Sequence, residues 1–376
     1  MFNDLCKQTY EELEKKSSGK QIVLWGRNRE RALKAMDKFD NIKYIVDTDC
    51  EKWGGAYRGY KVYSADKLYG ENPDDIIILV TAGPDYAYEI TNQIKMIDNF
   101  SVFYLHVLEE EWFNSISNEL YDNLDKIKSC IGMLDDDLSK RILAETVKRR
   151  IMGCNGSFSD LRTKGEMQYL FPTIYEKCCE KVILDCGAYI GDTAVRYVEN
   201  FGNRVCKMYC YEALPKNLEA LEKVQEKMQK EFGWKGEIVV LPYAVCDKES
   251  TIQFWETELP HGSFVPELRN TANAKFNHTV NCFDVKTCSI DDTVPIDEEV
   301  TLIKMDIEGA EYEALLGAEK TIKRNKPCCA ISIYHNASDY WRLMMLLKEF
   351  VPEYKFAVRH YKNRHVDTVL YAWEDD

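Results

Sequence analysis

The feature that most constrains this chain is an apolar segment that runs directly into a glycine-containing turn. Residues 182–193 read Val-Ile-Leu-Asp-Cys-Gly-Ala-Tyr-Ile-Gly-Asp-Thr. This pattern predicts a buried strand that ends at Asp185, followed by a turn at Gly187 and Gly191. A second predicted strand follows about twenty residues later and ends at Glu212. This is the layout of a nucleoside-binding α/β unit, in which a tight turn contacts the ligand and a carboxylate binds its ribose.

The residues of this turn favour S-adenosylmethionine over a dinucleotide as the ligand. A dinucleotide turn has the pattern G-x-G-x-x-G because its pyrophosphate lies against bare backbone. Here Ala188 and Tyr189 stand where the second glycine is needed, and Asp185 would repel a diphosphate. The same carboxylate suits the sulfonium and ammonium groups of S-adenosylmethionine, and Gly187 lets the backbone pass close to its amino-acid part. A turn without any ligand remains the alternative.

We expect further cofactor contacts along the same edge of the sheet. Glu212 is the natural ribose ligand, because a carboxylate accepts hydrogen bonds from both ribose hydroxyls. Ala188, Tyr189, Gly191 and Thr193 complete the predicted cofactor turn. Tyr243 and Ala244 follow the third predicted strand, where an adenine ring commonly rests in such sheets.

Composition excludes several classes of protein. The chain has 376 residues, enough for two domains, and a net charge of −14 without a long Lys/Arg run, so a nucleic acid is not expected as substrate. The first 20 residues lack the apolar core of a signal peptide, and no apolar run is long enough for a membrane span, so we expect a cytoplasmic protein. The 14 cysteines include no C-x-x-C pair, which favours reduced, buried thiols over a zinc site.

Predicted strands alternate with predicted helices, which indicates an α/β fold of two doubly wound modules. Residues 1–110 are predicted to form a Rossmann-like domain, residues 111–171 a helical connector, and residues 172–376 a second domain with a seven-stranded, mostly parallel sheet. The strands expected in the second domain are 182–185, 207–211, 238–241, 302–305, 330–334, 355–359 and 368–372, the last two as an antiparallel edge pair. Two further extended pieces are expected at 251–256 and 284–287.

The first domain has a degenerate phosphate turn. Only Gly26 remains of the glycine pattern, with Arg27 and Asn28 after it. Arg27 or Arg29 could hold an anionic ligand, but we favour a scaffold that serves packing or partner contact.

Acidic residues and a histidine follow two strands of the second domain. Asp306 ends the predicted strand 302–305, and Glu308 and Gly309 form the turn that follows it. Ligands of such sheets bind at this edge, so Asp306 can face the sulfonium or the incoming nucleophile. His335 ends the next strand and could accept a proton from a substrate hydroxyl. The alternatives are an acidic cluster that stabilises a helix N-terminus and a histidine at the polar surface.

Four further segments follow the glycine turn. In order, they are Tyr211-Glu212-Ala213-Leu214-Pro215, Ala244-Val245-Cys246-Asp247, Ser289-Ile290-Asp291-Asp292 and Lys304-Met305-Asp306-Ile307-Glu308-Gly309-Ala310-Glu311. Together with residues 182–193 they resemble the FkbM family of methyltransferases, over about residues 180–340. The resemblance implies a class I methyltransferase-like sheet and O-methylation of a sugar or natural-product hydroxyl. It also implies that Asp185, Gly187 and Glu212 bind the cofactor and that Asp306, Glu308 and His335 line the reaction site. The chain differs from the family at Tyr334, where an acidic residue often precedes the histidine.

The sequence therefore predicts an S-adenosylmethionine-dependent O-methyltransferase that acts on a hydroxyl of a sugar, glycan or related small molecule. The alternatives are a non-catalytic module that binds a nucleotide or nucleotide-sugar, and an NAD-dependent sugar-modifying enzyme. A divalent metal between Asp306 and Glu308 stays open, although their oxygens would suit Mg²⁺. The acceptor and the oligomeric state, including a homo-oligomer, also stay open.

Overall fold

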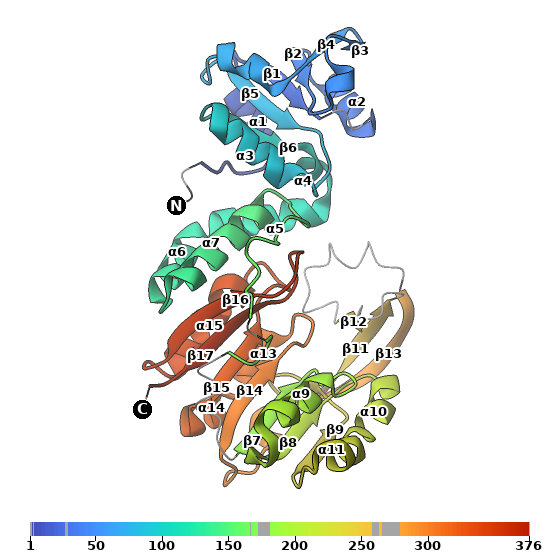
Figure 1. Cartoon of the computed structure of the whole chain (residues 1–376), viewed down its shortest axis with the longest axis vertical. Coiled ribbons are helices and arrows are strands. Elements are labelled where there is room, and N and C mark those ends of the chain that lie inside the picture. The colour runs from blue at the N-terminus through green and yellow to red at the C-terminus, as the bar shows by residue number, and fades with distance from the viewer. Residues whose placement is uncertain are drawn as a thin grey trace. The chain divides into compact units, whose positions relative to one another are not determined.

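The structure is a computed structural model that describes residues 2, 4–26, 29–165, 167–171, 181–257, 263–264 and 279–375. Arg27 and the side chain of Arg29, which could hold an anionic ligand, lie outside the described part. The chain folds as two compact units, shown in Figure 1. The first unit contains Met1–Asp125, Ala144–Leu161 and Lys362–His365, and the second contains Lys126–Leu143, Arg162–Tyr361 and Val366–Asp376. The residues expected to form a separate connector are thus shared between the two units.

The first unit is built on a six-stranded sheet with the order β3-β4-β2-β1-β5-β6. The predicted strands are present as β1 (Gln21–Trp25), β2 (Ile42–Val46), β5 (Ile76–Val80) and β6 (Ser101–Tyr104), all parallel to their neighbours. The sheet is extended by β4 (Tyr60–Tyr63), parallel to β2, and by β3 (Ala56–Tyr57), antiparallel to β4. All five residues of β5 are buried, which explains why this strand reads as an unbroken apolar run.

Helices accompany this sheet in the chain order expected of an α/β unit. In order they are α1 (Tyr10–Ser17), α2 (Arg29–Lys38), α3 (Ala87–Ile97), α4 (Leu105–Glu109) and α5 (Glu111–Asp122), with short 3₁₀ helices at Cys50–Lys52 and Ala65–Gly70. The helices α6 (Leu124–Met133) and α7 (Asp137–Ile151) follow. Helix α7 begins among residues of the second unit and ends among residues of the first.

The degenerate turn of the first unit is packed against protein. Gly26 has φ +97°, and a Cβ atom there would lie 2.8 Å from the Cβ and 2.9 Å from the N of Ala82. Asp47, at the end of β2 where a dinucleotide fold binds ribose, instead pairs with Lys52 at 3.2 Å. These contacts favour the scaffold interpretation of the first unit.

The second unit contains a seven-stranded sheet with the order β16-β17-β15-β14-β7-β8-β9. All seven predicted strands are present, as β7 (Lys181–Cys186), β8 (Val205–Tyr211), β9 (Glu237–Leu241), β14 (Val300–Met305), β15 (Cys328–Ser332), β16 (Lys355–His360) and β17 (Thr368–Trp373). β17 runs opposite to the other six strands and pairs antiparallel with β15 and β16, which confirms the predicted mostly parallel sheet with an antiparallel edge. The predicted fold class is therefore confirmed.

Helices connect these strands, as a parallel sheet requires. They are α9 (Asp192–Phe201), α10 (Pro215–Leu221), α11 (Val224–Phe232), α12 (Ile290–Thr293), α13 (Glu311–Leu316), α14 (Glu319–Asn325) and α15 (Asp339–Phe350), with a 3₁₀ turn at Gly202–Arg204. Figure 1 shows α9, α10 and α11 in green and yellow beside β7, β8 and β9.

A second, smaller sheet has the order β10-β13-β11-β12. The two extended pieces predicted between the third and fourth strands are β11 (Ser250–Thr257) and β13 (Thr279–Cys288), which pair antiparallel. Short strands β10 (Ala244–Val245) and β12 (Ser263–Phe264) complete it. The sequence did not predict that these pieces form a sheet of their own.

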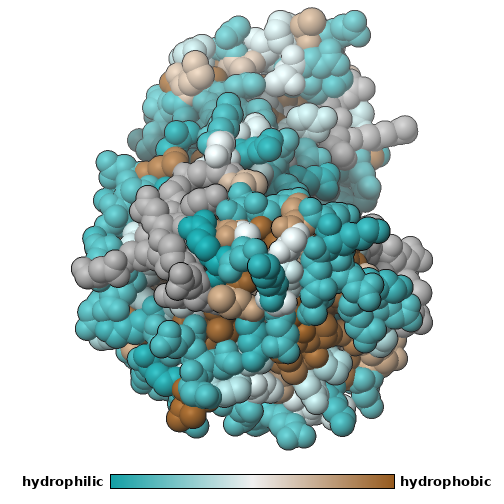
Figure 2. All heavy atoms as spheres, turned by 60° about the horizontal axis from the view of Figure 1, so that its bottom comes forward, coloured by the Kyte–Doolittle hydropathy of each residue, from teal (hydrophilic) through white to brown (hydrophobic). Residues whose placement is uncertain are grey.

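The visible surface is mostly hydrophilic, as expected for a chain rich in charged residues. Hydrophilic side chains cover most of the face shown in Figure 2, and hydrophobic residues occupy smaller areas. Within the described residues, none of the helices is long and apolar enough to cross a bilayer.

The packing at Gly26 gives a testable prediction. We expect Gly26→Ala to destabilise the first unit by about 1–3 kcal/mol more than Gly19→Ala, because the added methyl group must displace Ala82. Gly19 is a matched control, since it also has positive φ (+75°) but has no atom within 4 Å of an added Cβ. Urea unfolding followed by circular dichroism measures both variants, and equal midpoints would contradict the steric argument.

Candidate active site

The predicted site residues lie at the carboxyl ends of neighbouring parallel strands. Asp185 lies near the end of β7 and the glycine turn follows that strand. Glu212 follows β8, Asp306 follows β14, and His335 lies just after β15. The pairing of β14 with both β7 and β15, and of β7 with β8, brings these four ends to one edge of the sheet. This is the edge at which open α/β sheets bind their ligands.

The glycine turn after β7 packs closely against β14. Gly187 has φ +77°, and a Cβ atom there would overlap the carbonyl oxygen of Asp306. The N–H groups of Gly187 and Ala188 both donate to the carbonyl of Tyr211 at the end of β8, at 3.0 and 2.9 Å. Glycine is therefore required here by a backbone approach, and the turn is fixed to the strands on both sides.

The rest of the turn leads into helix α9. Tyr189 has φ +52°, an unusual conformation for a residue with a side chain, and its N–H donates to Glu212 Oε2 at 2.8 Å. Gly191, with φ +79°, precedes the first residue of α9, and Thr193 is buried in the first turn of that helix.

Glu212 is held in a fixed orientation by hydrogen bonds. Its Oε1 accepts from the N–H of Leu214 at 2.8 Å and from Asn217 Nδ2 at 3.2 Å, and its Oε2 accepts from Tyr189. Burial raises the pKa of this carboxyl above its usual value, although these donors oppose the shift. A carboxylate has about four lone-pair positions, so Glu212 can accept further hydrogen bonds from a ligand.

Asp185 is paired with a lysine of the neighbouring strand. It is completely buried and lies 2.9 Å from Lys304 Nζ, which is also buried. The same lysine donates to the carbonyl oxygens of Gly187 at 2.7 Å and Cys186 at 3.3 Å. Burial opposes the charged form of Lys304, but the Asp185 and Asp306 carboxylates outweigh it and raise the pKa of the lysine. The contacts of Asp185 thus go to the lysine of the next strand, and its predicted contact with the cofactor sulfonium stays a proposal.

Two tyrosines hold Asp306. The hydroxyl of Tyr169 donates to Asp306 Oδ2 at 2.9 Å, and the hydroxyl of Tyr334 donates to Oδ1 at 3.1 Å. Tyr169 also lies 3.3 Å from the hydroxyl of Ser332. Burial works against the charge on Asp306, but His335 and Lys304 outweigh it and hold its pKa below the usual value. Asp306 is therefore an oriented, ionised carboxylate.

His335 lies among three carboxylates. Its Nδ1 is 2.9 Å from Glu311, and its Nε2 is 3.6 Å from both Asp306 and Glu308. Burial disfavours the charged imidazole, but Glu311, Glu308 and Asp306 outweigh it and raise the pKa of His335 to about 9. These carboxylates favour the charged form of the ring, and the predicted role of His335 as proton acceptor stays a proposal.

The predicted adenine-binding residues lie at the start of the smaller sheet. The N–H of Tyr243 donates to Leu241 at the end of β9 at 2.9 Å, and Ala244 begins β10. The sequence did not single out Tyr169 or Tyr334 as site residues. Glu311 belongs to the acidic motif, but the sequence did not predict a role for it in the site.

The comparisons with known proteins point to a methyltransferase family. A profile of the methyltransferase FkbM domain matches residues 185–358. Among solved structures, the chain is similar to methyltransferase FkbM from Methylobacillus flagellatus KT, with a TM-score of 0.52 and 19% identity, over 99% of this chain and 95% of that chain. At this identity the similarity shows a shared fold.

The second unit contains an FkbM methyltransferase domain, which the profile matches at residues 185–358. The chain is accordingly an enzyme, an S-adenosylmethionine-dependent methyltransferase.

Two further similarities are weaker. Precorrin-6y C5,15-methyltransferase from Geobacter metallireducens is 12% identical over 57% of this chain and 92% of that chain, with a TM-score of 0.31. Aeropyrum pernix fibrillarin in complex with S-adenosyl-L-methionine is 14% identical over 58% of this chain and 87% of that chain, with a TM-score of 0.32. TM-scores this low support no inference about the FkbM domain. The comparison with curated proteins finds no match.

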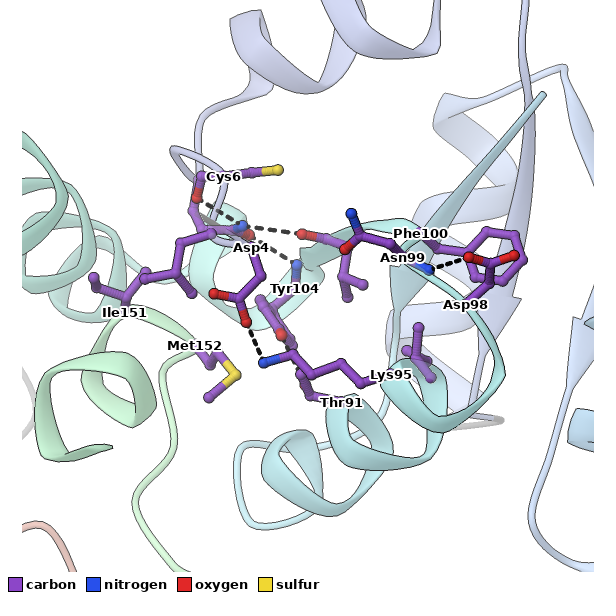
Figure 3. A pocket seen from close by; sticks show the side chains of 14 residues that line it. Asp4, Cys6, Thr91, Lys95, Asp98, Asn99, Phe100, Tyr104, Ile151 and Met152 are labelled. Atoms are coloured by element: carbon purple, nitrogen blue, oxygen red, sulfur yellow. Dashed lines mark hydrogen bonds and ion pairs between the residues drawn. The ribbon is translucent and has the colours of Figure 1, made fainter. Parts of the chain in front are cut away.

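A small pocket lies away from the methyltransferase domain, within the first unit (Figure 3). Asp4 and Lys95 form an ion pair at its wall. Gln8 is fixed by three backbone groups: it donates to the carbonyls of Cys6 and Val102, and its Oε1 accepts from the N–H of Tyr104 at 3.0 Å. Asp4, Gln8, Thr91 and Lys95 already have partners, so the pocket offers no obvious ligand site.

The buried Lys304–Asp185 pair gives a prediction for the FkbM domain. We expect Lys304→Met to destabilise the domain by about 3–5 kcal/mol, because it leaves the Asp185 charge buried without a partner. The double variant Asp185→Asn/Lys304→Met should recover much of this loss. Thermal unfolding measures all three proteins, with the exposed Lys320→Met as control. A single variant as stable as the control would contradict the prediction.

Proposed function

We propose that the FkbM domain transfers the methyl group of S-adenosylmethionine to a hydroxyl of a sugar, glycan or related small molecule. The observation that supports this most is the carboxylate-rich edge of the sheet. Asp306, Glu308 and Glu311 surround one cationic ring, His335, so this part of the edge is net negative. A cationic ligand is favoured there, and a diphosphate would be repelled.

The residues present fit this cofactor. Glu212 is buried, oriented by hydrogen bonds and able to accept from the two ribose hydroxyls. Gly187 and Gly191 place the backbone turn beside it, and Tyr243 and Ala244 are the proposed adenine contacts. When bound, the cofactor supplies a methyl group that its sulfonium has already activated.

The chain's own residues then have to position the acceptor and remove its proton. The acceptor oxygen must lie in line with the methyl group and its leaving sulfur, and such positioning supplies much of the rate in reactions of this kind. Asp306 is ionised and held by Tyr169 and Tyr334, so it is the residue we propose to accept the hydroxyl proton. His335 is the alternative base. Its charged form favours the ionised form of Asp306, and Glu308 offers a second carboxylate beside the ring.

The alternatives derived from the sequence receive less support. Tyr189 occupies the position at which an NAD-binding turn needs glycine. In the first unit, the turn at Gly26 is packed against Ala82 and Asp47 is paired with Lys52. No described contact there favours a nucleotide or nucleotide-sugar.

Binding of the cofactor provides one test. We expect Glu212→Gln to weaken S-adenosylmethionine binding by about 10–100-fold, because hydrogen bonds to a charged group are worth about 1.5–3 kcal/mol. Isothermal titration calorimetry measures the affinity, and the exposed Glu222→Gln at the end of α10 serves as control. Unchanged binding in Glu212→Gln would remove the proposed ribose contact.

Methyl transfer provides a second test. Incubation of the enzyme with S-adenosylmethionine and a panel of mono- and oligosaccharides should give products heavier by one methyl group in mass spectrometry. We expect Asp306→Asn to lower the rate by about 10²–10⁴-fold, since a carboxamide cannot take up the proton. Binding of the cofactor by this variant shows that its site is intact. Transfer at the wild-type rate would contradict the role of Asp306.

A further inference from the structure

Tyr169 occupies a backbone position that a tyrosine rarely takes. It is the third residue of a turn over residues 167–170, in which the N–H of Leu170 donates to the carbonyl of Met167 at 3.0 Å, and its φ is +66°. Glycine or asparagine usually takes the third position of a turn when φ is positive there, because a larger side chain is strained. Such strain persists only where surrounding contacts hold it, and it is common at functional sites.

Two buried tyrosines hold the backbone of Tyr169. Its N–H donates to the hydroxyl of Tyr371 at 3.0 Å, and its carbonyl accepts from the hydroxyl of Tyr197 at 3.5 Å. The hydroxyl of Tyr371 also lies 2.7 Å from that of Tyr361, and its ring stacks on Phe171 with the ring centroids 5.0 Å apart. The strained turn is therefore attached to β17 and to α9.

The side chain of Tyr169 extends from this turn to the candidate active site. Its hydroxyl donates to Asp306 Oδ2 at 2.9 Å and lies 3.3 Å from the hydroxyl of Ser332. Burial and the Asp306 carboxylate raise the pKa of Tyr169 well above its usual value, so the hydroxyl keeps the proton that it donates. The unusual backbone thus places a hydrogen-bond donor on Asp306, which a glycine in the same turn could not supply.

We propose that Tyr169 and Tyr371 are positioning residues for methyl transfer: Tyr371 holds the strained turn, and the turn holds the hydroxyl of Tyr169 against Asp306. The inference rests on the proposed function, in which Asp306 accepts the proton of the acceptor hydroxyl. One tyrosine precedes the profile match at residues 185–358 and the other follows it, so the proposed site extends beyond the matched residues on both sides. Tyr371 acts through the backbone of Tyr169 and needs no contact with cofactor or acceptor.

The physical effect is on the orientation of one carboxylate. Without the hydroxyl of Tyr169, Asp306 Oδ2 loses this donor, while Oδ1 keeps the hydrogen bond from Tyr334. The carboxylate can then rotate away from the acceptor hydroxyl, and small displacements of a reacting group slow a reaction strongly. Cofactor binding should change little, because the proposed ribose contact is made by Glu212 on another strand.

Kinetics of full-length variants test the proposal, with S-adenosylmethionine and the saccharide of the panel that the wild type methylates fastest. We expect Tyr169→Phe to lower kcat by about 10–100-fold, the effect of a lost hydrogen bond to a charged group. Tyr371→Phe keeps the ring and should lower kcat by about 5–20-fold. In both variants the KM for S-adenosylmethionine should stay within about twofold of the wild-type value.

Tyr354→Phe is the matched control. Tyr354 is also a buried tyrosine of the second unit, and its hydroxyl donates to the carbonyl of Pro327. This variant loses one buried hydroxyl but none of the contacts of Tyr169, so it should transfer methyl groups at the wild-type rate. Circular dichroism shows whether each variant is folded. If Tyr169→Phe does not fold, equal kcat values for Tyr371→Phe and Tyr354→Phe overturn the proposal.

The double variant Tyr169→Phe/Tyr371→Phe separates positioning from a general structural role. If Tyr371 acts through the hydroxyl of Tyr169, the double variant should be about as slow as Tyr169→Phe alone. A loss in the double variant equal to the product of the two single losses would overturn the role of Tyr371. Wild-type kcat in a folded Tyr169→Phe overturns the whole inference and leaves the proposed function standing. Absence of transfer by the wild type to every saccharide overturns the proposed function itself, and the positioning role with it.

Discussion

The ion pair between Lys304 and Asp185 is the interaction on which the site depends. Both residues are buried within neighbouring parallel strands, and Lys304 also binds two carbonyls of the glycine turn. The lysine therefore fixes the end of β7, the turn after it and the end of β14 as one piece. Such a pair adds little net stability by itself, because burial of both charges is costly, but loss of one partner is severe. Its role is to define the geometry of the edge.

That geometry explains how the edge can carry an excess of carboxylates. Lys304 neutralises Asp185, and His335 partly neutralises its neighbours, so the negative charge that remains is concentrated at Asp306 and Glu308. Tyr169 and Tyr334 stabilise the ionised form of Asp306 by donating hydrogen bonds. A cation that enters this region meets oriented carboxylates, which require little reorganisation.

The sequence was sufficient for the fold and for part of the site. Unbroken apolar runs such as β5 and β14 predict buried parallel strands, and their ends place Glu212, Asp306 and His335 at one edge. The partner of Lys304 was not predictable, because two carboxylates lie near it and a sequence does not show which one it faces. Tyr169 lies 137 positions from Asp306, so no local pattern connects them. The raised pKa of His335 follows from three surrounding carboxylates, and only their distances reveal it.

The two turns at this edge are coupled through one close approach. The Gly187 backbone lies against the carbonyl of Asp306, and on the other side of that residue Glu308 adopts φ +63°. A side chain in this left-handed region costs about 1–2 kcal/mol, so surrounding contacts must hold it there. A shift of the cofactor turn would therefore move Asp306, and with it the carboxylate beside His335. Cofactor binding and acceptor activation are thus expected to respond together to changes in either turn, even when the altered residue contacts only one ligand.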